Sequence, residues 1–435
     1  MAFYNGGLST HLIDPVFNRE NFQSEFRLNP NTVYLSNMRL ANVGCTVKTG
    51  ETGPYNALTG AYGVIKSIQL YDDNTLLDQI LELPIWMAFS NYNHPNERNR
   101  SVNDKLSQNG MGFGYLNDGV KDATDTNVFN IGSIQQFVAS TAANVNDPQN
   151  GTTPTPTGWL DLQRLLPFLS SPGARYIPTT LFKNLRLVVQ YDSAAANITP
   201  SKTGSEPKST EPFLIVDELM SSNVKDKVSR SKFQTQFNPI EHDRVTLPLG
   251  AGGAAVQQNT FTLHGFDNKY VGRFLMVNTP VGGQQADTGG AYGKLGSVAQ
   301  VSQTVQIRVN GQNKLPSNGI SKPNERLAYL NDTWGTCNTY TGANVSWLYA
   351  LSTADDATQA SGVFVKDPLV RVGQLDYFGM TVTEMINDLE IEYSRKTYDG
   401  GGATAYKQEL NLNCFAQTRK AVLQDGKGSY NVVYV

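Results

Sequence analysis

Apolar and polar residues alternate along many short stretches of this 435-residue chain. In FKNLRLVVQYDS, residues 182–193, apolar side chains occupy every second position from Leu185 to Tyr191. This alternation is typical of a β-strand that buries one face and exposes the other. The same pattern predicts strands in both halves of the chain, at residues 32–40, 62–71, 184–192, 244–249, 259–266, 272–280, 303–310, 388–394 and 408–417. The sequence therefore predicts an all-β protein.

Helical periodicity is rare. Residues 158–171, GWLDLQRLLPFLSS, place leucines at the spacing of one amphipathic helix, although Pro167 limits its length. Residues 376–388, DYFGMTVTEMIND, predict a weaker second helix. Long polar segments interrupt the strands, and loops of this length within a compact domain usually carry interactions. We predict such loops at residues 90–125, 140–158, 192–212 and 329–362.

Two pattern elements occur twice and in the same order. The strand that begins at Leu185 recurs at Leu389, in DLEIEYS, at an offset of 389 − 185 = 204 residues. Earlier in each half, SIQLYDDNTLLD (residues 67–78) and TVQIRVNGQNKLP (residues 304–316) both predict a hairpin, at an offset of 305 − 68 = 237 residues. Both offsets are near half the chain length, which indicates an internal duplication into two domains. The polar run at residues 221–232 lies where a linker between equal halves is expected.

The composition supports two packed cores. Hydrophobic residues make up 39% of the chain and charged residues 17%, a balance that excludes a disordered polymer. The formal net charge of −3 argues against a protein that grips nucleic acid with a basic surface. The three cysteines, Cys45, Cys337 and Cys414, form no CxxC pair, so we expect free buried thiols in a reducing compartment. No secretory signal is present, and the longest apolar run, LPIWMAFS at residues 83–90, is too short for a membrane span, so we expect synthesis in a cytosol-like compartment.

Catalytic and metal-binding motifs are not found in the sequence. The four histidines, at positions 11, 94, 242 and 264, do not lie at zinc-ligand spacing, and neither a G-x-S-x-G nucleophile elbow nor a phosphate-binding P-loop occurs. Glu390 and Glu392 share one strand face about 7 Å apart, as the acid and base of a glycosidase or as the exposed face of a half-buried strand. We favour the second interpretation, and we interpret Asp72 and Asp73 as turn-forming residues rather than calcium ligands. We therefore predict no enzyme activity and no catalytic, cofactor-binding or metal-binding residue.

Three segments resemble double jelly-roll major capsid proteins of DNA viruses. They are NPNTVYLSNMRLANVG (residues 29–44), GVIKSIQLYDDNTLLDQI (residues 63–80) and GWLDLQRLLPFLSSPGARYIPTTLFKNLRLVVQYD (residues 158–192). In the third segment a short helix and a proline-containing connection lead into a late strand. The likeness is to the capsid proteins of polinton-like viruses and virophages, with the nucleocytoplasmic large DNA viruses as more distant relatives.

The resemblance implies two consecutive eight-stranded antiparallel jelly-roll sandwiches with long loops and a few short helices. It divides the chain into an N-terminal arm (1–29), a first jelly roll (30–222), a linker (223–232) and a second jelly roll (233–435). It also implies a homotrimer of pseudo-hexagonal outline that tiles an icosahedral shell. The implied partners are neighbouring capsomers, penton and minor capsid proteins and an internal membrane or inner layer, without sequence-specific contact to nucleic acid. The chain would then belong to the virion, after synthesis in the host cytoplasm or a viral factory.

Two hypotheses concern surfaces outside the jelly rolls. We expect the N-terminal arm to contact neighbouring subunits or the inner side of the shell, with four phenylalanines as anchors: Phe3, Phe17, Phe22 and Phe26. The basic cluster at residues 225–232 is either solvated linker charge or a contact with a neighbouring subunit or an inner layer. Two alternative functions remain: a penton or minor virion component, and a non-viral double β-sandwich protein that binds or cleaves glycans.

Overall fold

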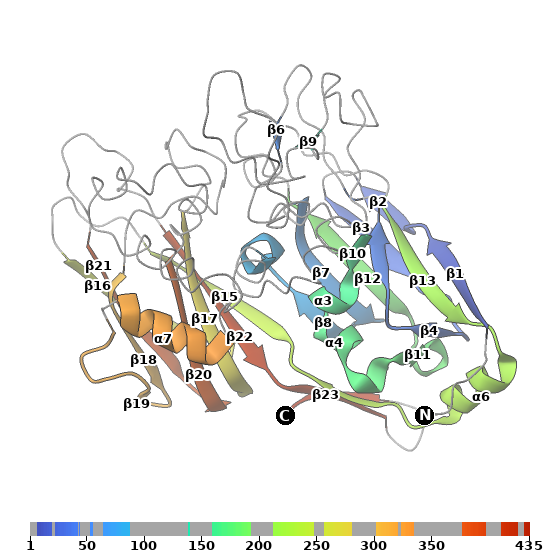
Figure 1. The fold of residues 1–435 in the computed structure, drawn as a ribbon. Coiled ribbons are helices and arrows are strands. Elements are labelled where there is room, and N and C mark those ends of the chain that lie inside the picture. Colours follow the sequence, from blue (N-terminus) through green and yellow to red (C-terminus); the bar gives the residue numbers. More distant parts are fainter. Residues whose placement is uncertain are drawn as a thin grey trace.

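The computed structural model describes residues 7–19, 22–41, 43, 53–54, 64–87, 138–139, 159–192, 212–247, 256–280, 302–320, 323–334, 376–396, 410–424 and 430–435. Within these residues the chain folds into two antiparallel β-sandwiches that stand side by side (Figure 1). The predicted all-β fold is therefore confirmed. The greater part of each predicted long loop lies outside the described residues.

The first sandwich has two sheets. In one sheet, β13 pairs with β1 on one side and with β5 and β4 on the other, while β10 and β11 extend that second side. The other sheet has the order β2-β3-β12-β7-β8. The strands of the first sheet are β1 (Leu8–Ile13), β4 (Val33–Leu35), β5 (Arg39–Ala41), β10 (Trp159–Asp161), β11 (Tyr176–Pro178) and β13 (Phe213–Leu219). Those of the second are β2 (Phe17–Arg19), β3 (Gln23–Arg27), β7 (Ile65–Asp72), β8 (Thr75–Ile80) and β12 (Leu185–Tyr191).

The second sandwich also has two sheets, with the orders β15-β22-β17-β20 and β16-β21-β18-β19. The first of these contains β15 (Ile240–Leu247), β17 (Lys269–Pro280), β20 (Asp376–Ile386) and β22 (Leu410–Thr418). The second contains β16 (Val256–Leu263), β18 (Ser302–Val309), β19 (Gln312–Asn313) and β21 (Leu389–Lys396). Helix α7 (Pro323–Trp334) packs on β20. A separate strand pair joins β6 (Gly53–Pro54) to β9 (Val138–Ala139).

The two sandwiches repeat one topology. In chain order, eight strands of the first half correspond to eight of the second, and corresponding strands have corresponding partners: β1 and β15, β3 and β16, β4–β5 and β17, β7 and β18, β8 and β19, β10 and β20, β12 and β21, and β13 and β22. This is the two-sheet, eight-stranded arrangement of a jelly roll. The strand repeated at Leu185 and Leu389 is the same strand of the jelly roll in each half, and both predicted hairpins form, as β7–β8 and β18–β19.

Alternation along these strands builds the two cores. In β12, Leu187 and Val189 face the core of the first sandwich, and in β21, Leu389, Ile391 and Tyr393 face that of the second. Each of these side chains is at most 3% exposed. Burying a large apolar side chain stabilises the fold by about 1.5–3 kcal/mol, and the repeated strand buries at least two such side chains in each core.

A third sheet connects the halves. It contains β14 (Gln234–Phe237), β23 (Lys420–Gln424) and β24 (Tyr430–Tyr434), all from the second half of the chain. Nevertheless Phe233, Phe237 and Val422 belong to the core of the first sandwich, and Tyr430 and Val432 pack against it. Part of the segment that we assigned to the second jelly roll (233–435) therefore packs on the first.

The predicted N-terminal arm differs from the structure. Within residues 1–29, β1 and β3 are strands of the first jelly roll, paired with β13 and β12. The segment of β3, QSEFR, is mostly polar, which hid the alternation of buried Ser24 and Phe26 with less buried neighbours. Phe26 is therefore a core residue, whereas Phe17 and Phe22 are 46% and 53% exposed. Phe3 lies outside the described residues.

The helix predictions were partly wrong. The segment at residues 376–388 forms strand β20 (Asp376–Ile386) instead of a helix, because Phe378, Met380 and Val382 alternate into the core. The amphipathic segment forms two short helices, α3 (Leu162–Leu165) and α4 (Pro167–Ser170), because a residue before proline favours extended backbone and Leu166 adopts it. The predicted linker (223–232) is mostly helix α6 (Ser222–Arg230). Among the described residues, no helix has the length and hydrophobicity that crossing a membrane requires.

Candidate functional site

The two jelly rolls contact each other along an interface where β8 lies beside β15, which we call the seam (Figure 1). The first jelly roll contributes Trp86, from a short helical turn at residues 83–87. The Trp86 ring lies 5.6 Å from the rings of both Phe415 and Trp334. Phe415 on β22 pairs with His242 on β15, and their rings are 4.8 Å apart. The first jelly roll therefore covers the outer face of β15 and β22.

Helix α7 reaches the seam because one glycine gives it room. A Cβ atom on Gly379 of β20 would lie 2.8 Å from Cδ1 of Trp334 and 2.9 Å from Cδ1 of Leu330, so any other residue would force these side chains to shift. Trp334 is 5% exposed, and its indole N–H donates to the carbonyl of Phe274 at 3.1 Å. Gly379 thus lets α7 lie flat on β20 and place Trp334 beside Trp86.

A group of ionisable side chains is buried deeper in the seam. The Asp78 carboxylate accepts backbone hydrogen bonds from Phe168 at 2.7 Å and from Gln79 at 2.9 Å. Burial raises the pKa of Asp78 to about 7, although these hydrogen bonds and nearby Lys420 favour its charged form. Burial also lowers the pKa of Lys420, against the attraction of Glu241 and Asp78. The two halves therefore meet through carboxyl and ammonium groups whose charge is costly to bury.

The C-terminal strands β23 and β24 form further hydrogen bonds at this seam. The Lys420 ammonium donates to the carbonyl of Leu76 at 3.1 Å. The Tyr434 hydroxyl donates to Glu241 at 2.9 Å, and the Tyr430 hydroxyl donates to Asp72. Burial, together with these carboxylates, raises the pKa of both tyrosines, so they remain hydrogen-bond donors at neutral pH. Lys420 and Tyr430 join the last strands to the first jelly roll, and Tyr434 joins them to β15 of the second. Together these contacts fix the relative orientation of the two sandwiches.

The corresponding outer face of the first jelly roll is open. There β1 and β13 occupy the places that β15 and β22 occupy in the second. On this face Leu8 and Leu12 are 56% and 64% exposed, and Leu12 lies opposite Ile215. Figure 1 shows β1 on the side of the first jelly roll that faces away from the second. The face that is covered in the second jelly roll is therefore exposed in the first, where Leu8 and Leu12 flank the polar pair Thr10 and Asp217.

The two glutamates considered as catalysts lie on an exposed sheet face. Arg308 on β18 is paired with Glu390 on β21 and bonds to it, and its other terminal nitrogen lies 2.9 Å from Glu392. Gln258 donates to the second Glu392 oxygen at 2.5 Å. One guanidinium thus forms ion pairs with both carboxylates, whereas a glycosidase needs one protonated and one free carboxyl group. This arrangement favours the structural interpretation of the pair.

The other residues singled out in the sequence are dispersed. Asp72 ends β7, where it accepts a hydrogen bond from the backbone of Asn184 at 2.7 Å, and Asp73 has the positive φ of 52° that a tight turn requires. In the part of the chain that the structure describes, no group of three metal-ligating side chains is found. Cys414 is a buried free thiol, as predicted, and burial raises its pKa well above the ordinary value. Cys45 and Cys337 lie outside the described residues, as does the histidine at position 94.

The basic cluster on α6 is partly used within the fold. Val224 and Val228 of α6 pack against Val33 and Leu219 of the first jelly roll. The Lys225 ammonium lies 2.6 Å from Glu218. The remaining basic residues of the cluster are at least partly exposed on the helix or just beyond it: Lys227, Arg230 and Lys232.

Comparisons with known structures identify this architecture. The chain has the double jelly-roll fold. A chain of the Sputnik virophage structure matches 100% of this chain and 90% of its own length, with a TM-score of 0.56 and 12% identity. VP54 of PBCV-1 matches with a TM-score of 0.55 and 9% identity, covering 100% of this chain and 98% of its own. The mavirus major capsid protein matches with a TM-score of 0.54 and 9% identity, covering 99% and 90%.

These likenesses concern the fold, because every identity is far below 25%. No protein-family model matches the sequence, and no curated protein sequence matches it. The structural neighbours cover nearly the full length of the chain, so the repeated topology and the comparisons describe the same two sandwiches.

None of the seam residues was predicted as functional. Trp86 lies in the apolar run LPIWMAFS, whose length we considered only as a membrane span. Asp78 and Lys420 are 342 positions apart (420 − 78 = 342), so no local pattern links them. The one local signal was the tryptophan itself, since tryptophan is enriched at protein interfaces.

Proposed function

We propose that this chain is a major capsid protein whose homotrimers form pseudo-hexagonal capsomers of an icosahedral virus shell. The observation that carries the proposal is the repetition of one jelly-roll topology in two sandwiches held side by side within one chain. Three such chains would present six similar sandwiches around one axis. The neighbours of the same fold include a protein described as the mavirus major capsid protein and a chain of the PBCV-1 virus capsid.

The seam supplies a geometric reason for a ring. Within the chain, the side of the first jelly roll that carries β8 and Trp86 covers the outer face of β15 and β22. In a ring, the matching side of the second jelly roll, with β19, β20 and α7, would cover the outer face of β1 and β13 in the next copy. This contact is heterologous, and heterologous contacts generate closed rings when their rotation closes. Leu8 and Leu12 would then be buried between copies.

The proposal includes no catalysis. The paired Glu390 and Glu392 are occupied by Arg308, which supports a structural role for the strand face that they share. In the virion, penton and minor capsid proteins would meet the capsomer at its rim. The exposed basic residues of α6, with Lys232, would face an inner layer or membrane. Each of these partners is part of the proposal.

Sedimentation velocity at micromolar protomer concentration tests the trimer. We expect one species near 3 × 47.6 kDa, about 143 kDa, and hexagonal outlines in negative-stain images. Leu12→Lys places a charge in the proposed contact and should yield monomers with an unchanged circular dichroism spectrum, since Leu12 is 64% exposed within one chain. Thr260→Lys is the matched control and should remain trimeric, because Thr260 is an exposed residue of β16, in the sheet β16-β21-β18-β19 of the second jelly roll.

A stable monomer of the unmodified protein at this concentration would overturn the proposal. A pentamer would instead support a penton role. If Leu12→Lys and Thr260→Lys both remained trimers, the trimer would stand and the proposed contact through β1 would be wrong. Deleting residues 1–29 is unsuitable as a test, because it removes β1 and β3 from the sheets of the first jelly roll.

A further inference from the structure

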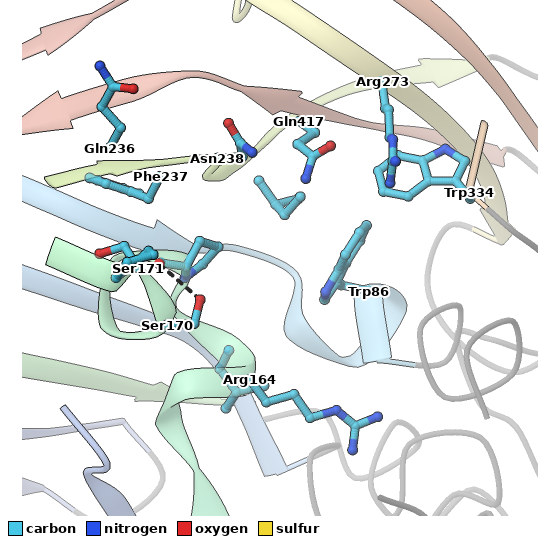
Figure 2. A pocket seen from close by; sticks show the side chains of 14 residues that line it. Trp86, Arg164, Ser170, Ser171, Gln236, Phe237, Asn238, Arg273, Trp334 and Gln417 are labelled. Carbon is cyan, nitrogen blue, oxygen red and sulfur yellow. Dashed lines mark hydrogen bonds between the residues drawn. The ribbon is translucent and has the colours of Figure 1, made fainter. Parts of the chain in front are cut away.

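A cavity of about 510 Å³ opens at the seam between the two jelly rolls (Figure 2). Its volume is within the range of about 300–1,000 Å³ that small-ligand sites occupy. The first jelly roll contributes Trp86 and the segment from α3 to the turn after α4, while the second contributes residues of β14, β15, β17, β22 and α7. The cavity therefore exists only where the two sandwiches meet.

The cavity wall combines aromatic surface with positive charge. Figure 2 shows Trp86 between Arg164 on one wall and Arg273 on the other. The Arg273 guanidinium lies 5.7 Å from the centre of the Trp334 ring, and among the described residues it makes no ion pair. Among the described lining residues, Arg273 supplies a positive charge beside the ring of Trp334, and none is a carboxylate. By charge complementarity, the occupant of such a site carries negative charge.

The hydrogen-bonding groups around the cavity point to the same class of ligand. The indole N–H of Trp334 already donates to Phe274, so this tryptophan offers the cavity ring surface rather than a polar group. The amide side chains of Asn238 and Gln417 lie along the wall that carries Arg273 (Figure 2). Arginine binds a carboxylate through charge-assisted hydrogen bonds while its face stacks on an aromatic ring.

We propose that this cavity binds a small amphipathic carboxylate, with its aromatic body against Trp86 and its carboxylate at Arg273. The site goes beyond an assembly role, because it is formed within one chain. A ligand held there contacts both jelly rolls at once and therefore stabilises the seam.

Isothermal titration calorimetry with 2-naphthoate tests the proposal, and its neutral isostere 2-naphthamide isolates the effect of charge. We expect 2-naphthoate to bind one site per chain, at least about tenfold more tightly than the amide, because the guanidinium contact is charge-assisted. Arg273→Gln should remove this preference and leave the weak affinity for the amide unchanged. Added salt should weaken the binding of the carboxylate and not that of the amide.

Arg419→Gln is the matched control. Arg419 is likewise an exposed arginine over an aromatic ring, 4.6 Å from the centre of the Tyr270 ring, and it does not line the cavity. This variant should bind 2-naphthoate as the unmodified protein does. The proposal is overturned if 2-naphthoate shows no saturable binding at millimolar concentration, if both probes bind equally, or if the two arginine variants lose affinity to the same extent. Oligomeric state, measured in parallel, separates this outcome from a failure of the proposed capsomer.

Discussion

Replacing Asp78 by asparagine removes one titrating carboxyl group from the seam while keeping its shape. Asp78 is fully buried, and its pKa in the folded protein is about 7, compared with an ordinary value of 3.8. The neutral form therefore predominates in the folded seam at pH values below about 7. Asparagine resembles that neutral form and cannot ionise.

The magnitude follows from linkage between protonation and folding. Below pH 3.8 the carboxyl is protonated in both the folded and the unfolded chain. Between pH 3.8 and about 7 it ionises only in the unfolded chain, so the free energy of unfolding falls as the pH rises. At about 1.4 kcal/mol per pKa unit, the whole decrease is on the order of 4 kcal/mol. Above pH 7 both states are ionised, and the contribution of this group no longer changes.

Urea unfolding between pH 4 and pH 8, at one fixed protein concentration, measures this decrease. Subtracting the curve of Asp78→Asn from that of the unmodified protein isolates the group. We expect the difference to slope downward by about 1.4 kcal/mol per pH unit at most and to level off above pH 7. The variant should also lose about 1–3 kcal/mol of unfolding free energy at every pH, because its amide nitrogen faces a backbone N–H of Phe168 or Gln79. This constant loss does not affect the slope of the difference curve.

The matched control is Asp73→Asn, which removes an exposed carboxylate from the same hairpin. Asparagine tolerates the positive φ of 52° at this position, so the backbone is preserved. The two aspartates differ in burial, since Asp73 is exposed and Asp78 is buried. If the Asp78→Asn difference curve were no steeper than that of this control, or sloped upward with pH, the inference that burial raises the pKa of Asp78 would be refuted.

Three further variants test packing at other points. Gly173→Ala should lower the free energy of unfolding, measured in urea, by about 1–3 kcal/mol, because the Cβ of the alanine would lie 2.1 Å from the carbonyl oxygen of Gln234. Gly272→Ala is the control and should change this free energy little, because the nearest atom to its Cβ is 3.7 Å away. Tyr430→Phe, which loses the bond to Asp72, should cost about 1–3 kcal/mol and speed proteolytic removal of the C-terminus. Arg308→Gln should leave the melting temperature unchanged within error, because exposed ion pairs contribute little, and a clear decrease would contradict this.

Strands with strict alternation were predictable because their signal is local. The apolar face of β12 is visible in residues 185–191 alone, and the same holds for β18 and β21. Helix α7 was missed although Pro323 and Glu325 mark its start, because its apolar residues run into a segment that we interpreted as a loop. The sequence of β20 fits either period, and its pairing with β17, which is remote in the sequence, makes it a strand.

The seam could not be predicted, because its chemistry depends on groups brought together from distant positions. In the sequence, Asp78 is one polar residue in TLLDQI, and its burial depends on Phe168 and Lys420. The β7–β8 pairing also contains an irregularity, between Leu70 and Tyr71, which changes the face that Asp78 occupies relative to simple alternation. Non-local contacts of this kind carry no periodic signature.

The two equivalent faces of the duplicated fold differ in a way that fits their different tasks. The face within the chain is aromatic, with Phe415 under Trp86, and the third sheet reinforces it through Tyr430 and Lys420. The open face on β1 combines the aliphatic Leu8 and Leu12 with the hydrogen-bonded pair Thr10 and Asp217, and has no such reinforcement among the described residues. In the proposed ring, the contact within each chain would therefore hold its shape while the contact between chains remained weak enough to open. Reversible contacts between rigid units allow a misplaced subunit to leave before the shell closes.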